Sequence, residues 1–178
     1  MSRSSTWSNS DGLAVGFGTH TKDNDVSAVT SERGSVKTVV MEINGTSVPS
    51  TWAAANVQPQ GVLIPRGSII VDATFQVVTA FTSGGAATLN IGTYGGAAFT
   101  TADDIDGIDA AVAVAAIDAI GETVQCDGAL VNTTVAVGAT ADTDVVLGYN
   151  YGTAAYTAGK GILTVMYIEP SGGNTIAA

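Results

Sequence analysis

Reactive side chains are scarce in this sequence. Its 178 residues include one cysteine, Cys126, and one histidine, His20. A single cysteine excludes an internal disulfide, and a zinc site needs several cysteine or histidine ligands. A serine or cysteine nucleophile usually needs a histidine base, whereas His20 lies in a polar stretch beside Lys22 and Asp23. We therefore expect no zinc site and no such hydrolase, and we interpret Cys126 as a small buried side chain.

Positive charge is also scarce. Six Lys and Arg residues oppose sixteen Asp and Glu residues, and the formal net charge is -10. Residues 1–66 are neutral overall, whereas residues 67–178 carry one basic side chain, Lys160, and eleven acidic ones. Nucleic acids and anionic membranes attract clustered lysine and arginine, so neither is an expected partner. A neutral first third and an acidic body suggest that the first part attaches and the second stays soluble.

Long apolar runs are absent too. The longest, 110–117, lies between Asp109 and Asp118 and is too short to span a bilayer. No basic segment followed by an apolar one opens the chain, so we expect no signal peptide. Glycine-rich stretches such as 92–96 lack the sequence context of a phosphate-binding loop, so we expect no cofactor. The sequence predicts a soluble protein made in a reducing cytoplasm.

Acidic side chains do cluster within 103–109. The cluster comprises Asp103, Asp104, Asp106 and Asp109. Carboxylate pairs can hydrolyse sugars, and the spacing partly resembles a calcium loop, but Ala102 and Ala113 occupy two ligand positions of the EF-hand pattern. We interpret the cluster as helix capping and solubility, with weak calcium binding and a glycosidase as minor alternatives.

Aromatic residues are only 6% of the chain, with Trp7 and Trp52 the only tryptophans. Sugar-binding sandwiches usually need exposed aromatic platforms, which this composition does not favour. A small group, Tyr149, Tyr151 and Tyr156, is interpreted as core or interface packing.

Residues 1–34 are predicted to form an extended arm. Eleven of these 34 residues are Ser or Thr, and so polar a segment cannot bury enough surface alone to offset its ordering entropy. Its few large apolar side chains favour docking onto a partner over a plain linker. They are Trp7, Leu13, Val15 and Phe17.

Residues 35–170 are predicted to form the folded body, followed by a loose tail at 171–178. Alternating apolar and polar residues predict strands at 36–43, 68–81, 86–92 and 144–151, with further candidates at 61–64, 123–131 and 133–137. In 68–81, the pattern places Ile69, Val71, Ala73, Phe75 and Val77 on one face. The turn at 83–85 predicts that 68–81 and 86–92 pair as a hairpin.

Two other segments carry distinct predictions. Apolar residues at helical spacing and several alanines predict a short helix within 107–118. Glycines at 159–161 predict a turn into the strand 162–168, which is apolar on both faces. Such a strand is either central in its sheet or covered by a second subunit. In the second case Ile162, Met166 and Ile168 would form a subunit interface. The whole pattern predicts an all-β, jelly-roll-like antiparallel sandwich with one short helix.

Several turn and strand segments share a rhythm with a known group of proteins. They are IPRGSIIV at 64–71, LNIG at 89–92, CDGALV at 126–131, and YTAGKG at 156–161 before a strand ending in YIE. Over about residues 60–170 the chain resembles small virion structural proteins of tailed bacteriophages, in particular capsid decoration (cement) proteins. That resemblance implies a jelly-roll or related β fold, often trimeric, bound outside the shell and reinforcing it.

We therefore expect a non-enzymatic protein of the virion, placed on the capsid exterior. Its expected partners are the major capsid protein and, in a homotrimer, copies of itself. The arm would contact the shell through Trp7, Leu13, Val15 and Phe17. The alternative is a receptor- or glycan-binding module of a head fibre or tail, with a binding patch around Tyr149 and Tyr151.

Overall fold

The computed structural model describes residues 36–51, 63–96, 98–99 and 101–169, together with the backbone of two short strands nearer the N-terminus. The chain divides into two compact units, Met1–Ser31 and Glu32–Ala178. The predicted tail at 171–178 lies outside the described residues, as do Leu13, His20 and Trp52.

The first unit contains one pair of antiparallel strands. They are β1 (Ser5–Ser8) and β2 (Ala14–Phe17). Trp7 lies opposite Val15 in their register. The sequence predicts no strand here, because the segment has no sustained alternation.

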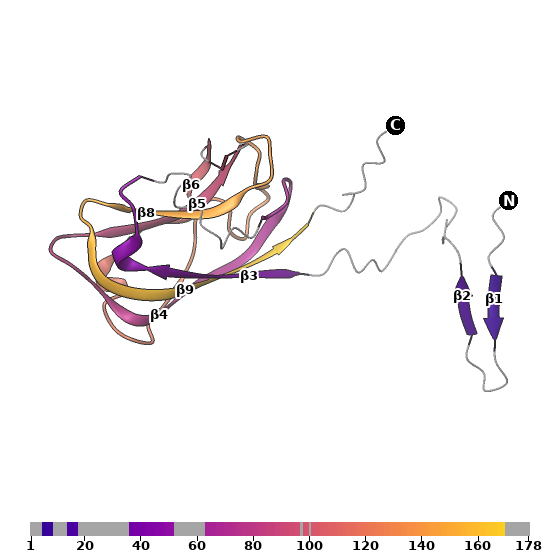
Figure 1. The fold of residues 1–178 in the computed structure, drawn as a ribbon, viewed down its shortest axis with the longest axis horizontal. Coiled ribbons are helices and arrows are strands. Elements are labelled where there is room, and N and C mark those ends of the chain that lie inside the picture. Colours follow the sequence, from indigo (N-terminus) through magenta and orange to yellow (C-terminus); the bar gives the residue numbers. More distant parts are fainter. Residues whose placement is uncertain are drawn as a thin grey trace. The chain divides into compact units, whose positions relative to one another are not determined.

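The second unit is a sandwich of two antiparallel sheets, which form two layers in Figure 1. One sheet has four strands in the order β3-β9-β4-β7, and the other has three in the order β6-β5-β8. The strands of the first sheet are β3 (Lys37–Asn44), β4 (Ile69–Ser83), β7 (Thr123–Gln125) and β9 (Tyr156–Ile168). Those of the second are β5 (Thr88–Gly95), β6 (Thr101–Ala113) and β8 (Val146–Gly152).

This strand order confirms the predicted jelly-roll-like sandwich. The chain passes repeatedly from one sheet to the other, and β9 returns to lie between β3 and β4. An isolated antiparallel bridge joins Ile64 to Val145, next to the start of β8. The two sheets have four and three strands, and the segment at Ile64 lies beside β8 at the position of the eighth strand of a jelly roll.

Alternating side chains from both sheets fill one continuous core. Ile43, Phe75 and Leu163 are fully buried on the first sheet, and Leu89 and Ile91 are fully buried on the second. The strands predicted at 86–92 and 162–168 are thus present within β5 and β9. Burial of these apolar side chains is the main favourable term in folding.

The predicted helix within 107–118 is wrong. Residues 101–113 form β6, and the helical part is a three-residue 3-10 turn, Val114–Ala116. Ile108 and Val112 are buried against β5, where Leu89 lies opposite Val112. Pairing with β5 and burial in the sandwich outweigh the helix propensity of the alanines, which amounts to only a few tenths of a kcal/mol per residue.

The predicted hairpin of 68–81 with 86–92 is also wrong, because β4 and β5 belong to different sheets. The predicted turn at 159–161 is wrong as well, since β9 runs straight through it. A methyl group on Gly161 would lie 2.2 Å from the Phe75 ring, and one on Gly159 would lie 2.4 Å from the Phe81 ring. These glycines let two phenyl rings approach the strand closely.

Two finer strand predictions also change. In β4 a register shift between Ile70 and Asp72 turns Ile70 into the core, so that Ile69 and Val71 are only half-buried. The candidate strand 133–137 is a loop, and the strand predicted at 123–131 ends at Gln125. A bulge moves every later side chain to the other face, which a fixed two-residue period does not anticipate.

Candidate assembly surface

The outward face of the four-stranded sheet carries the most prominent surface feature. On β9, Leu163, Val165 and Tyr167 point into the core. Ile162, Met166 and Ile168 therefore point away from it, with Met166 38% exposed and the two isoleucines half-buried. Because β9 lies between β3 and β4, its central position in the sheet accounts for apolar residues on both of its faces.

Neighbouring strands extend this face in rows across the sheet. Met166 lies between Thr38 of β3 and Asp72 of β4. In the next row outward, Val40 of β3 lies opposite Thr164, and Val40 is 60% exposed. The surface thus combines apolar side chains and hydroxyls with the carboxylate of Asp72, and its apolar part is suited to packing against another protein.

This sheet carries two ion pairs and one further carboxylate. Glu42 of β3 and Lys160 of β9 form an ion pair at 2.9 Å on the outward face, and Lys37 pairs with Glu169 at the end of the sheet. Asp72 lies on the outward face beside Met166. Exposed pairs of this kind add little to stability. Because both pairs are neutral, this sheet carries less net charge than the chain as a whole, whose net charge is -10, so an approaching protein meets less repulsion here.

Val40 is the residue of this surface that the sequence analysis missed. The strand 36–43 was predicted, and its buried positions are Val39, Met41 and Ile43. The same alternation places Val40 outward, so an apolar residue at a solvent-facing position was the available signal.

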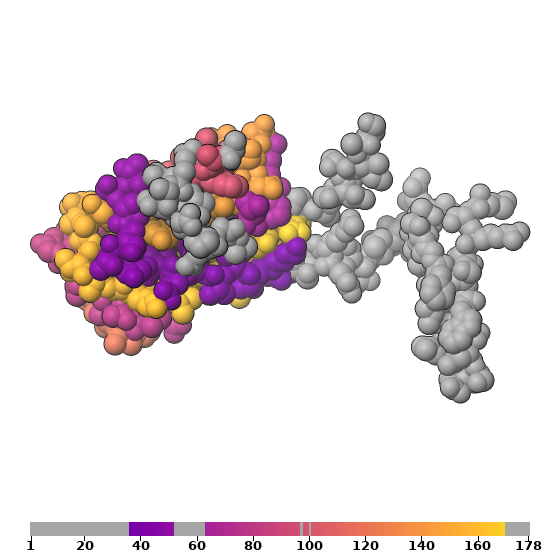
Figure 2. Space-filling view, viewed as in Figure 1, coloured from indigo at the N-terminus to yellow at the C-terminus, as the bar shows by residue number. Residues whose placement is uncertain are grey.

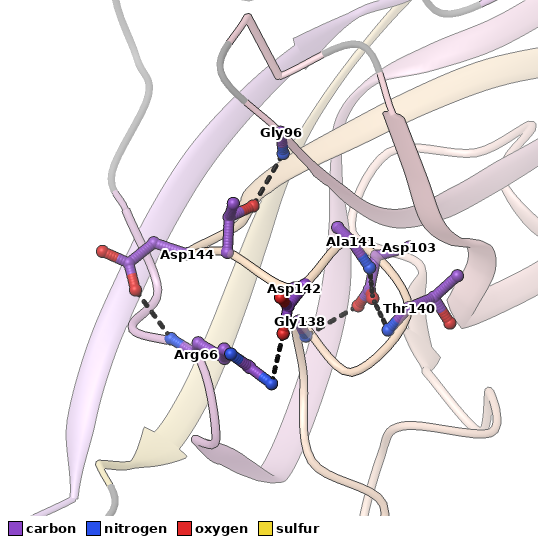
Figure 3. Close-up of polar contacts among 9 residues, drawn as sticks. Arg66, Gly96, Asp103, Gly138, Thr140, Ala141, Asp142 and Asp144 are labelled. Carbon is purple, nitrogen blue, oxygen red and sulfur yellow. Dashed lines mark hydrogen bonds and ion pairs between the residues drawn. The ribbon is translucent and has the colours of Figure 1, made fainter.

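The acidic cluster has a structural use at Asp103. Its carboxylate accepts hydrogen bonds from the backbone N–H groups of Gly138, Thr140 and Ala141 at 2.8, 2.8 and 3.1 Å (Figure 3). It also accepts one from the Thr93 hydroxyl at 3.1 Å. Four donors occupy the two oxygens of this one group. Asp103 thereby fixes the loop 138–141 onto the second sheet.

Further polar contacts hold the same end of the sandwich. Arg66 forms an ion pair with Asp142, and the Arg66 N–H donates to Asp144 at 2.9 Å (Figure 3). The Gly96 N–H donates to the Thr143 hydroxyl at 2.7 Å. The sequence analysis missed this network, because the donors and acceptors come from segments 30 or more residues apart.

This arrangement does not favour calcium binding or acid–base catalysis by the cluster. The carboxylate of Asp103 is saturated by the loop, and within the described segments no three His, Cys, Asp or Glu side chains gather as metal ligands. Asp109 is buried on the core side of β6, 5% exposed, away from the outward face. The predicted role of these residues in capping a helix is wrong, because they lie on a strand.

Cys126 is buried, as predicted from its surroundings in the sequence. Its thiol and the Asp109 carboxylate are hydrogen-bonded. Burial and the neighbouring carboxylate raise the pKa of Cys126 to about 12, and burial also raises the pKa of Asp109. A thiol with so high a pKa is a poor nucleophile at neutral pH.

The tyrosines of the alternative binding patch serve packing. Tyr156 is 5% exposed, and its ring meets the Phe81 ring edge to face at 5.3 Å between centroids. Tyr149 and Tyr151 are half-buried and pack against the core. All three side chains thus take part in packing.

The predicted arm residues are placed only by their backbone. Trp7 lies on β1, and Val15 and Phe17 lie on β2. Along the described part of the chain no helix is long and apolar enough to cross a bilayer.

Comparison with known proteins gives structural neighbours. No protein family and no curated protein matches the sequence. A chain of the cyanophage Pam1 capsid asymmetric unit is similar with a TM-score of 0.51 and 16% identity, over 82% of this chain and 92% of that one. Chains of the capsid of Ralstonia phage GP4 (TM-score 0.47, 18% identity, 81% and 90% covered) and of the acidic stable capsid of Helicobacter pylori bacteriophage KHP30 (0.48, 17%, 76% and 89%) also match. At this identity the Pam1 likeness shows a shared fold.

Proposed function

We propose that this chain is a structural, non-enzymatic protein of a phage virion. The observation that carries the proposal is the sandwich shared with a chain of the Pam1 capsid, which is matched over 92% of its length. A match over most of both chains means that the two proteins are of similar size and have the sandwich as their main folded part. The sequence resemblance to virion proteins points in the same direction.

Within the virion, the chain acts as a decoration protein on the outside of the capsid. The acidic body suits that position, since packaged DNA would repel its charge from the inner surface. A small sandwich with a partly apolar outward sheet face and a separate N-terminal unit is suited to attachment onto a larger scaffold. The major capsid protein is the partner that such a role requires.

In this proposal one surface binds the capsid shell and another binds further copies of the chain. The arm 1–34 contacts the shell through Trp7, Leu13, Val15 and Phe17. The outward residues of β9, Ile162, Met166 and Ile168, face another copy in a homotrimer. Three weak shell contacts within one trimer would add through multivalency.

The test is attachment to assembled heads of the phage that carries this protein. Full-length chain and a variant lacking 1–34 are mixed with undecorated shells, and bound protein is measured after sedimentation. We expect the full chain to bind shells and not free coat subunits, and the deletion to weaken binding with its circular dichroism and melting retained. Decoration at undiminished affinity by the deletion variant would refute the role of the arm.

Assignment of density in electron micrographs of virions tests the position. Density for the sandwich on the outer surface of the head supports the proposal. Density inside the shell or on the tail would refute it. Replacement of Met166 by Lys tests the trimer by sedimentation equilibrium, with Ile105→Lys, an exposed position on β6 of the other sheet, as the control.

A further inference from the structure

The two sheets have four edges, and three of them are protected against pairing with another chain. β7 is only three residues long. The pairing of β6 with β5 has three register shifts, Ala111 has φ 56°, and the N–H groups of Gly128 and Leu130 bond to carbonyls of β6 at 2.9 and 2.8 Å. Short, bulged or covered edges are the usual devices by which proteins avoid unwanted strand pairing.

The β8 edge is covered as well. Ile64 and Val145 exchange two backbone hydrogen bonds at 2.8 and 3.0 Å, and the Tyr151 N–H donates to the Pro49 carbonyl at 2.9 Å. Segments of the same chain thus occupy this side of the strand at both of its ends.

The edge of β3 differs from the other three. It pairs with β9 over eight residues without any register shift. Among the residues that the structure describes, its other side has no backbone partner. It contains no proline and no bulge, and Figure 2 shows the indigo atoms of β3 lying at the surface. A regular, open strand of this kind is a template for an additional strand.

We propose that the β3 edges of two copies of this chain pair antiparallel, with Val40 at the two-fold axis. The sheets of both copies then continue into one another. The contact is isologous, so it closes on itself and does not grow into a filament. It is distinct from the outward face of β9 that the homotrimer would use.

Local charge favours a second copy as the occupant. The described residues include three basic side chains, and two of them, Lys37 and Lys160, flank this edge and each neutralise a glutamate. Elsewhere the acidic body opposes self-association, whereas two copies can approach through β3 with little net repulsion.

Side-chain alternation fixes the register. Two residues that lie opposite each other in an antiparallel pair have their side chains on the same side of the sheet. Because side chains alternate between the two sides along each strand, this is possible only if the two-fold axis passes through a residue and not between two residues. With Val40 at the axis, the two 60%-exposed valines meet each other, and Thr38 of each copy lies opposite Glu42 of the other. An axis at Met41 would place Val40 against Glu42, and an axis at Glu42 would oppose two like charges.

A contact made by one strand is small, so we expect a weak dimer that is populated in concentrated protein. Disulfide trapping in the full-length chain suits it. Residues opposite one another in an antiparallel pair have Cα atoms about 4.5 or 5.5 Å apart, and both values lie within the range of about 4.4–6.8 Å for a disulfide. The native Cys126 is buried, and the wild-type protein shows how much disulfide-linked dimer forms through Cys126 alone.

The first measurement compares Val40→Cys with Val78→Cys, an exposed valine of β4 that is not on this edge. We expect a disulfide-linked dimer of the Val40 variant on a non-reducing gel, at least tenfold more abundant than that of the Val78 variant. Equal amounts, or no dimer from either variant, would overturn the proposal.

The second measurement tests the register. A mixture of Thr38→Cys and Glu42→Cys chains should form the mixed disulfide, identified by its mass, in preference to either homodimer. Dominance of the Glu42 homodimer would move the axis and refute the register. In sedimentation velocity, Val40→Lys should lower the weight-average mass of the concentrated protein, whereas Val78→Lys should not; circular dichroism verifies that both are folded. Because these measurements need no capsid, they separate this inference from the proposed function.

Discussion

Asp103 offers the sharpest test of how this fold is held together. Its carboxylate accepts four hydrogen bonds, three of them from consecutive parts of the loop 138–141. Asp103→Ala removes the acceptor and leaves three backbone N–H groups without their partner. Asp103→Asn keeps the size of the side chain but replaces one acceptor oxygen with a donor that faces other donors.

The magnitude follows from the kind of bond that is lost. A hydrogen bond to a charged group contributes about 1.5–3 kcal/mol, and a buried donor left unpaired costs a similar amount. The Thr140 N–H lies near solvent, so water can replace the carboxylate as its hydrogen-bond partner and reduce the loss of stability. Local opening of the loop exposes the other N–H groups to water and limits the remaining loss. We expect Asp103→Ala to lower the free energy of unfolding by about 2–3 kcal/mol, or the Tm by about 4–12 °C for a chain of this size.

Urea denaturation with a matched control checks this value. Asp118→Asn removes one negative charge at an exposed position that makes no hydrogen bond among the described residues, so it should change stability by less than about 0.5 kcal/mol. Hydrogen exchange should accelerate at 138–141 in the Asp103 variants before it does so in β5. If Asp103→Ala is as stable as Asp118→Asn, the carboxylate does not hold the loop and the reasoning fails.

Three further predictions concern the core. Gly161→Ala should destabilise the protein by about 1–3 kcal/mol in thermal melts, because its methyl group would enter the Phe75 ring, whereas Gly84→Ala has free space around it and should be near neutral. Burial raises the pKa of Asp109 above its value in the unfolded chain, so ionisation of this group opposes folding. Wild type should therefore gain stability relative to Asp109→Asn as the pH falls from 7 toward 4, and a pH-independent difference would contradict this. Cys126, with a pKa of about 12, should react with a thiol reagent only at the rate of unfolding, which absorbance of the released thiolate measures.

Local alternation was sufficient for much of the fold. In β3 and in the part of β9 at 162–168 alternate side chains are buried, and the sequence pattern predicted both of these segments as strands. The two apolar faces of β9 allowed either a central position or a covering subunit, and the structure provides the central position. The period of two is a property of the extended backbone itself, so it is visible without knowledge of the partner strands.

β6 shows where that reasoning failed. Its alanines and the spacing of its apolar residues favour a helix, yet Ile108 and Val112 are buried in a strand against β5. The glycines at 159 and 161 resemble turn residues, but their role is to admit the Phe81 and Phe75 rings. In each case the deciding contact comes from a segment distant in sequence, so no local pattern contains it.

By itself, the sequence determined the class of this protein: an acidic, all-β chain whose residues are poor in the groups that catalysis and metal binding use. These properties follow from composition and short-range periodicity. Only the tertiary structure decided which strands are neighbours, that Asp103 holds a distant loop, and that the edge of β3 is open. Strand order and edge exposure depend on contacts between residues far apart in the chain, and packing of the whole sandwich selects among the alternatives that local preferences leave open.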